Sequence, residues 1–355
     1  MTPDLHITRS RHPRPDARRV AFCDGGIDAS FRDGIDIELS HWIPNRTPAA
    51  LKADTSTGIA LRFVASGAAA DIELVVNNHV DTDGMLSVFV LCHPQQALAH
   101  RHTLEQAAAM GDFHAWGDAD AQHLFQLMAL TRQRLEAAQA DPQDIYRQVH
   151  ARVLRALAGE RFAETAPGLA ALQAAATALD EGRITRQLLA PHLVHYIAPL
   201  ALADDDALPP IDTPLPTQAV LPPQLRARQD GERLQLLSSP LGDGWRHDLC
   251  WPAYAWAETP QRWPAPGLRS TGNSNRHTLQ LPALDQACRA LAALEGGAGR
   301  WAVSAQLTPF AALPGRPFPV VLSCLQGDAP AASTLAPERV AAVLAQALAA
   351  TVGSD

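Results

Sequence analysis

Lysine and long apolar runs are nearly absent from this sequence. Of its 29 basic residues, 28 are arginine and one, Lys52, is lysine. No stretch approaches the roughly 18 consecutive apolar residues that a membrane span requires. The first 19 residues are rich in arginine, and only three apolar residues, 20–22, separate them from Cys23. This apolar run is too short for the apolar region of a signal peptide. We therefore expect a cytoplasmic protein with no membrane partner.

Paired cysteines and several nucleotide or hydrolase motifs are also missing. The five cysteines are odd in number and include no CxxC pair, which argues against a disulfide framework and a zinc knuckle. There is no GxxxxGK[ST], no GxGxxG after a strand and no GxSxG, so P-loop, standard dinucleotide-binding and serine-hydrolase chemistry lack support. The net charge of −8 disfavours nucleic acid as a partner, although it leaves a short oligonucleotide open.

The residues that are present indicate a globular protein of more than one domain. With 355 residues, 47% hydrophobic and 19% charged, the chain exceeds the usual size of a single core. We expect the α/β class, with a mostly parallel sheet covered by helices in the N-terminal half, a helical connector and a smaller α+β C-terminal domain. The expected segments are a flexible arm at 1–18, an α/β core at 19–140, a helical connector at 141–203, a proline-rich linker at 204–224 and a cap domain at 225–355.

Hydrophobic periodicity predicts the individual strands and helices. Expected strands lie at 20–23, 35–39, 72–76, 233–238 and 318–324. Expected helices lie at 55–63, 85–92, 97–110, 119–139, 142–200, 283–295 and 336–350, the first of them capped by Asp54 or Thr55.

The most specific motif follows the apolar run at 72–76. His79, Asp81 and Asp83 occupy alternate positions, so an extended backbone would point all three to one side, where they could chelate a cation. Imidazole and carboxylate ligands suit Mn²⁺, Mg²⁺, Fe²⁺ or Zn²⁺. The alternative is a tight acidic turn, since Asp-Gly is a common turn pair. A calcium-binding EF-hand loop starting at His79 is excluded, because it would place Val90 where a glutamate is required.

Two segments carry a family resemblance. NNHVDTDGMLS is similar to the metal motif of the DHH phosphoesterases, a superfamily of phosphatases, pyrophosphatases and exonucleases. LSHWIPNRTPAALKADTSTGIA looks like the region that follows the Asp-His-His signature of that superfamily. Ser40 and Trp42 replace the first and last signature residues, and the two motifs come in reversed order. The whole chain also resembles an uncharacterised bacterial family, a domain of unknown function.

The resemblance, in its permuted form, implies a site with two ions. His41 would be a fourth ligand and Asp24 a carboxylate bridge between ions about 3.5–4 Å apart. The residues alone leave other roles open: His41 as a hydrogen-bonded histidine at a strand end, and Asp24 as a turn residue. Asp112 is a further candidate ligand, with a helix cap or loop carboxylate as its alternative. Mn²⁺ is the expected metal, with Mg²⁺ or Fe²⁺ as alternatives, and Asp83 and His41 are the candidate catalytic residues.

Polar residues near these ligands could bind a substrate. Hydrogen-bond donors suited to phosphate oxygens lie on the neighbouring loops, and a C-terminal loop, RSTGNSNRH, could add more from a cap. Lys52 could equally be a solvated loop charge, and the C-terminal loop a plain polar loop. The candidate substrate-binding residues are Asn45, Arg46, Lys52, Thr55, Ser56, Asn275 and Arg276.

A cluster of tryptophans has no assigned role. Trp245, Trp251, Trp256 and Trp263 could fill a small core or form a wall that stacks on a planar ligand.

Three functions are compatible with these patterns. The first is a divalent-metal-dependent phosphohydrolase acting on a small phosphorylated substrate, in which metal-activated water cleaves a phosphodiester or phosphoanhydride. The second is a non-catalytic relative of that fold that binds a ligand or a protein. The third is a metal-dependent amide or ester hydrolase. Convergence of the candidate ligands within a few ångströms would favour an enzyme, and the sequence leaves the oligomeric state open.

Overall fold

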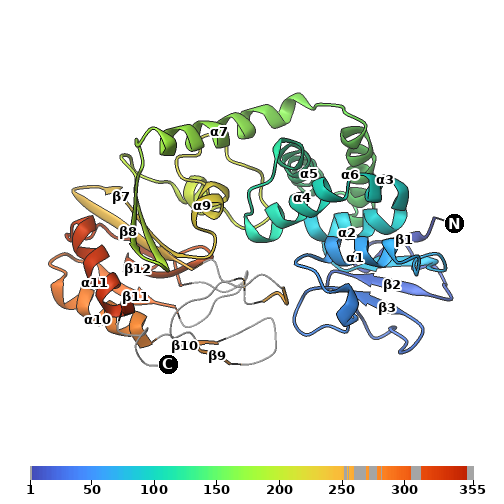
Figure 1. Ribbon diagram of the computed structural model, residues 1–355, viewed down its shortest axis with the longest axis horizontal. Helices are drawn as coiled ribbons and strands as arrows, with labels where there is room; N and C mark the ends of the chain where they lie inside the picture. The colour runs from blue at the N-terminus through green and yellow to red at the C-terminus, as the bar shows by residue number, and fades with distance from the viewer. Residues whose placement is uncertain are drawn as a thin grey trace. The chain divides into compact units, whose positions relative to one another are not determined.

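The computed structural model describes residues 2–251, 254, 256–259, 269–271, 278–280, 282–304 and 313–349 (Figure 1). The chain forms two compact units. Unit 1 consists of Met1–Leu169, Asp212–Leu215 and Ala257–Gln261, and unit 2 consists of Ala170–Ile211, Pro216–Trp256 and Arg262–Asp355. The two units are of nearly equal length, so the prediction of a smaller second domain is corrected.

Unit 1 contains the expected parallel sheet. Its strands pair in the order β1-β4-β2-β3, and every neighbouring pair is parallel. The strands are β1 (Asp4–Ile7), β2 (Val20–Cys23), β3 (Ile37–Leu39) and β4 (Leu74–Asn77). The α/β class is thus confirmed. The prediction of a flexible arm at 1–18 is wrong, because β1 is paired with β4 and the Ile7 side chain is fully buried.

Helices cover one face of this sheet. Helices α1 and α2 lie on the strands, and α4 and α5 pack outside them (Figure 1). The helices are α1 (Ser56–Ala65), α2 (Thr82–Cys92), α3 (Pro94–Ala99), α4 (Arg101–Phe113), α5 (Ala119–Ala137) and α6 (Pro142–Leu157), with short 3₁₀ turns at Ala49–Leu51 and Ala163–Thr165. Thr55 caps α1 as expected, since its side chain accepts a hydrogen bond from the Gly58 N–H.

The opposite face of the sheet is covered by loops. Alternate strand residues Val20, Phe22, Leu74 and Val76 form a buried cluster there, against which Phe31 packs. Because both faces are buried, β2 and β4 read as continuous apolar runs instead of alternating ones.

Unit 2 is built on a seven-stranded mixed sheet. Its strands run in the order β11-β12-β8-β7-β6-β5, with β13 pairing β12. Within the described ranges, only β6 and β7 are parallel neighbours. The strands are β5 (Thr185–Ala190), β6 (Leu193–Ile197), β7 (Leu234–Leu241), β8 (Gly244–Cys250), β11 (Arg300–Val303), β12 (Val320–Gln326) and β13 (Ala329–Pro330). A separate pair is formed by β9 (Arg269–Thr271) and β10 (Thr278–Gln280).

The helices of unit 2 correct the expected connector. Helix α11 packs on β5, β6 and β8, and α10 packs beside it against β11 (Figure 1). The helices are α7 (Ala166–Asp180), α8 (Asp204–Ala207), α9 (Pro223–Asp230), α10 (Pro282–Leu294) and α11 (Pro337–Ala349). The helical prediction for 142–200 therefore fails at its end, where β5 and β6 form a hairpin. β5 is an edge strand whose side chains are mostly exposed, so its residues show no core pattern.

Two further expectations concern the tryptophan cluster and membrane-spanning helices. Trp251 and Trp256 are each 1% exposed and Trp245 is half-buried in β8, so these tryptophans fill a core; Trp263 lies outside the described residues. None of the helices in the described ranges combines the length and the apolar character needed to cross a bilayer.

Candidate metal centre

Three adjacent strands of unit 1 end in a candidate ligand. Asp24 directly follows β2, His41 comes two residues after β3, and His79 comes two residues after β4. Parallel strands bring their carboxyl ends to one edge of the sheet, which is where open α/β sheets place their ligands. β3, β2 and β4 are neighbours in the sheet, so these side chains meet at one edge.

The first group of ligand atoms combines Asp24, His79 and Asp81. The Nε2 atom of His79 lies 3.1 Å from Asp24 Oδ2 and 2.8 Å from Asp81 Oδ2. One ligand atom from each residue lies within 4.8 Å of the others, a spacing that can hold a metal ion. The His79 side chain is 30% exposed and that of Asp81 18%, so this position is open to solvent on one side.

The second group is fully buried and shares Asp24 with the first. The Nε2 atom of His41 lies 3.6 Å from Asp24 Oδ1, 3.6 Å from Asp83 Oδ2 and 3.3 Å from Asp112 Oδ2. Asp24, His41 and Asp83 also meet the 4.8 Å spacing. Asp112 comes from the end of α4, which packs on α2. The two groups therefore overlap at Asp24, whose two oxygens face different histidines.

Hydrogen bonds orient the shared carboxylate. Asp24 Oδ1 accepts hydrogen bonds from Trp42 Nε1 at 2.9 Å and from Ser56 Oγ at 2.8 Å. The Asp24 backbone is left-handed, with φ of 47°, a conformation that aspartate tolerates better than most residues. The turn after β2 therefore directs this side chain toward His41 and His79.

Asp83 is held by the N-terminus of α1. Its Oδ2 accepts the Ser56 N–H at 2.7 Å and its Oδ1 accepts the Thr57 N–H at 2.8 Å. Free N–H groups at a helix N-terminus are suitable donors to a carboxylate, so these two hydrogen bonds fix the Asp83 side chain at the start of α1.

The concentration of acidic groups shifts the pKa values in the site. Burial, together with Asp83, Asp81, Asp24 and Asp212, raises the pKa of Asp112 well above its usual range. Burial alone would lower the pKa of His79, but Asp81 and Asp24 outweigh it and raise that pKa well above its usual value. Within the described residues, the buried Asp112 Oδ2 has no hydrogen-bond partner. A cation between these carboxylates would relieve their mutual repulsion.

The expected geometry of the His79 motif needs a correction. The strand ends at Asn77, Asp81 is the N-cap of α2 and accepts the Gly84 N–H, and Asp83 lies in the first helical turn. The three side chains therefore do not alternate along an extended strand. By the spacing of their ligand atoms, His79 and Asp81 belong to the first group and Asp83 to the second.

The candidate substrate-binding residues are already engaged within unit 1. Lys52 Nζ donates to Asn45 Oδ1 and, at 2.6 Å, to Glu258 Oε2, while Arg46 pairs with the exposed Asp33. Thr55 caps α1, and Ser56 contacts the ligands Asp24 and Asp83. Asn275 and Arg276 lie outside the described residues.

Sequence reasoning missed several residues that contact the candidate ligands or their loop. Among them are Trp42, Thr57, Arg132 and Asp212. Thr57 was detectable, because it follows a predicted helix cap and its N–H is one of the free donors of the first turn. Arg132 and Asp212 are far from the motif in sequence and carry no local signal.

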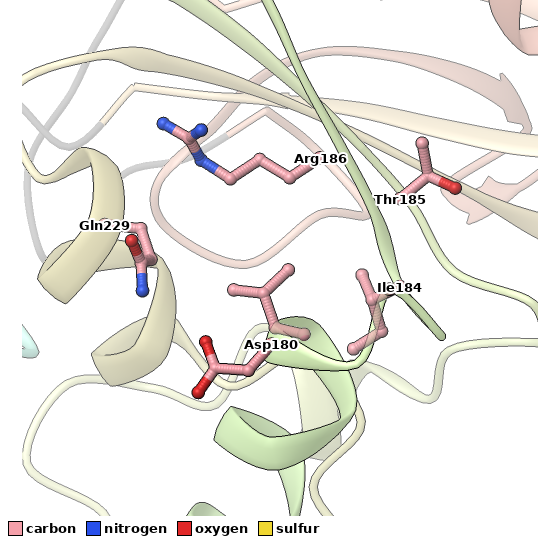
Figure 2. A pocket seen from close by; sticks show the side chains of 7 residues that line it. Asp180, Ile184, Thr185, Arg186 and Gln229 are labelled. Atoms are coloured by element: carbon pink, nitrogen blue, oxygen red, sulfur yellow. The ribbon is translucent and has the colours of Figure 1, made fainter.

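A pocket in unit 2 contains none of the candidate residues. It is lined by residues of α7, β5 and α9, among them Asp180, Thr185, Arg186 and Gln229 (Figure 2). The Arg186 guanidinium donates two hydrogen bonds to Asp230, at 2.8 and 2.6 Å, so its charge is already paired. The pocket therefore lacks the convergent polar groups of the candidate metal centre.

The segment that contains the candidate centre matches a known protein family. Residues 11–186 match a family of unknown function, DUF6687. The match includes all six clustered side chains and covers the N-terminal half, whereas the sequence analysis expected such a resemblance over the whole chain. No curated protein and no solved structure shows significant similarity to the chain. The resemblance to the DHH phosphoesterases gains no support from this match and stays a prediction.

Proposed function

We propose that unit 1 is a divalent-metal-dependent phosphohydrolase with a two-ion centre. The observation that supports this most strongly is the pair of overlapping ligand groups that share Asp24. Two-ion hydrolases use such a bridge to hold two cations about 3.5–4 Å apart. The mixed set of imidazole and carboxylate ligands suits Mn²⁺ best among the available metals, with Mg²⁺ or Fe²⁺ as alternatives.

The charge of the site supports occupancy by cations. Asp24, Asp83 and Asp112 are 1%, 0% and 6% exposed, and Asp81 lies beside them. Buried carboxylates without compensating positive charge are costly to fold, so a cluster of them persists where a cation neutralises it.

The candidate ligands form two metal positions that differ in their exposure to solvent. His79 and Asp81 form the more exposed position, where a small phosphorylated substrate and water can approach. His41, Asp83 and Asp112 form the buried position. Bound ions would activate water and neutralise charge on the phosphoryl oxygens. Trp42 and Ser56 keep the Asp24 carboxylate oriented between the two positions.

The proposal is tested by metal content and turnover in matched proteins. Wild type purified without chelator should contain Mn²⁺-class metal and release p-nitrophenol from bis-p-nitrophenyl phosphate when Mn²⁺ is added. The variant Asp81→Asn/Asp83→Asn should lose both properties. Asp33→Asn is the control, because the Asp33 side chain is 84% exposed and pairs with Arg46, whose side chain is also exposed. Absence of metal from wild type would refute the centre.

The same assay separates the rival functions. Metal with no turnover of phosphate esters, but with turnover of p-nitrophenyl acetate or an anilide, would indicate an amide or ester hydrolase, which uses the same ligands. Metal with no turnover of any of these substrates would favour a non-catalytic binding role.

A further inference from the structure

A short part of the proline-rich connecting segment lies in unit 1 beside the metal centre. Asp212–Leu215 cluster with unit 1, whereas the residues on either side of them cluster with unit 2. The Leu215 N–H donates to Gln126 Oε1 at 2.6 Å, and Gln126 Nε2 donates back to the Leu215 carbonyl at 3.3 Å. The Gln126 side chain is 2% exposed, so this part of the segment is anchored in the interior of the unit.

Asp212 contacts two of the elements that carry candidate ligands, α4 and α2. Its N–H donates to the carbonyl of Gly111, the residue before Asp112, at 3.1 Å. Its Oδ2 accepts the Thr82 N–H at 3.1 Å, at the start of α2 between Asp81 and Asp83. One residue of the connecting segment thus joins the N-terminus of α2 to the end of α4.

Arg132 of α5 completes this arrangement. Its Nη1 donates to Asp212 Oδ2 and, at 3.3 Å, to the carbonyl of Val80, which lies between His79 and Asp81. Its Nη2 donates to the Asp212 carbonyl. The guanidinium therefore fixes the ligand loop and the connecting segment at once, as the planar fork of arginine permits.

Packing shows that Asp212 fits this place closely. It is 8% exposed, and its backbone is left-handed with φ of 60°. A Cβ atom on Gly111 would lie 3.0 Å from Asp212 Oδ1 and 2.9 Å from Thr82 Cβ, so no larger residue fits between them. Asp212 Oδ1 is buried and accepts no hydrogen bond from any described residue, while Oδ2 of the same carboxylate pairs with Arg132.

We propose that Asp212 and Arg132 are positioning residues of the metal centre: they fix the loop from His79 to Asp83 and add a carboxylate behind it. This inference rests on the proposed function. Residues behind the direct ligands commonly change metal affinity by about 10–100-fold when they are removed. A protein ending at residue 169 would consequently lack part of its centre.

The test compares Mn²⁺ affinity in full-length variants, measured from the electron paramagnetic resonance signal of free Mn²⁺. Asp212→Asn keeps the shape and the acceptor for Thr82 but removes the charge, and it should weaken binding about tenfold. Arg132→Lys keeps the positive charge but removes the planar guanidinium that donates to both Val80 and Asp212, and it should weaken Mn²⁺ binding several-fold. Arg134→Gln is the control, because Arg134 is exposed on the same helix, and it should bind as wild type does.

Melting temperatures in EDTA separate positioning from a general structural role. We expect both variants to melt within a few degrees of wild type without metal, while their Mn²⁺ affinities fall. If Asp212→Asn does not fold, the Mn²⁺ affinity of Arg132→Lys alone tests the inference. Wild-type affinity in the folded variants would overturn this inference and leave the proposed function standing. Absence of Mn²⁺ binding by wild type would overturn both.

Discussion

At the scale of single residues, Asp24 is the candidate ligand whose backbone and side chain are held by the most features of the centre. It lies in a left-handed turn, accepts hydrogen bonds from Trp42 and Ser56 on one oxygen, and faces His79 with the other. Its sequence context, an apolar run ending in Asp-Gly-Gly, indicated a polar residue at a strand end. The role of Trp42 as a donor had no local signal, because a tryptophan after a strand most often packs in a core.

Trp42→Phe isolates the hydrogen bond to Asp24. The substitution keeps an aromatic ring near His79 but removes the N–H, so one carboxylate oxygen loses a donor. We expect a loss of about 1 kcal/mol in unfolding free energy and a several-fold weaker Mn²⁺ affinity by calorimetric titration. Trp245→Phe in unit 2 is the matched control and should leave the affinity unchanged. Equal affinity in both variants would show that Trp42 does not orient Asp24.

Buried His150 makes folding stability depend on pH. Burial lowers the pKa of this side chain to about 4, and its Nε2 contacts the Met85 carbonyl at 2.9 Å. The unfolded chain takes up the proton near its ordinary pKa of 6.5, before the folded protein does. Stability present at pH 7 is therefore lost progressively as the pH falls from about 6.5 to 4.

Urea unfolding of metal-free protein at pH 7 and pH 4.5 measures this dependence. The His150 contribution to the loss should be roughly 2–3 kcal/mol, and His150→Gln should reduce the pH dependence by that amount. His102→Gln is the control, since the His102 side chain is 73% exposed. An identical pH dependence in wild type and His150→Gln would contradict this assignment.

At the scale of elements, strand β1 supports the strand that carries the ligand loop. β1 pairs with β4 over Asp4 to Ile7, and β4 runs directly into the His79 loop. This strand was not predictable from the sequence, because a parallel pairing over some 70 residues leaves no local pattern and β1 is only four residues long.

Ile7→Ala tests whether β1 is part of the core. Ile7 is 0% exposed, so the cavity should lower the unfolding free energy by about 2–5 kcal/mol, measured by urea denaturation. Ile35→Ala makes the same chemical change at a side chain that is 49% exposed and should cost much less. Equal small effects in both variants would restore the interpretation of residues 1–18 as a flexible arm.

At the scale of the whole molecule, the sequence was informative where chemistry is local. Apolar runs ending in polar residues located β2, β3 and β4, and the capping pattern located α1 at Thr55. The candidate ligands were chosen partly from polar residues after apolar runs and partly from the family resemblance, and the structure brings all six side chains together. The division into two groups was not predictable, since it depends on Asp83 lying in a helical turn while His79 lies in a loop.

Long-range arrangement accounts for most of what the sequence did not reveal. The hairpin at 185–197 was predicted as helix because its edge strand β5 exposes most of its side chains and lacks an alternating pattern. Asp212 was assigned to a linker, although it contacts Thr82 and Arg132 in unit 1. Such contacts are set by tertiary packing, and no periodicity along the chain records them.

The most direct test of a two-ion centre is the stoichiometry of Mn²⁺ binding in single-ligand variants. By equilibrium dialysis, wild type should bind two ions, Asp81→Asn and Asp83→Asn one each, and Asp24→Asn should lose tight binding of both because both positions share this residue. Asparagine tolerates the left-handed backbone at position 24, so the turn should survive. Two tightly bound ions in Asp24→Asn, or none in wild type, would contradict the account.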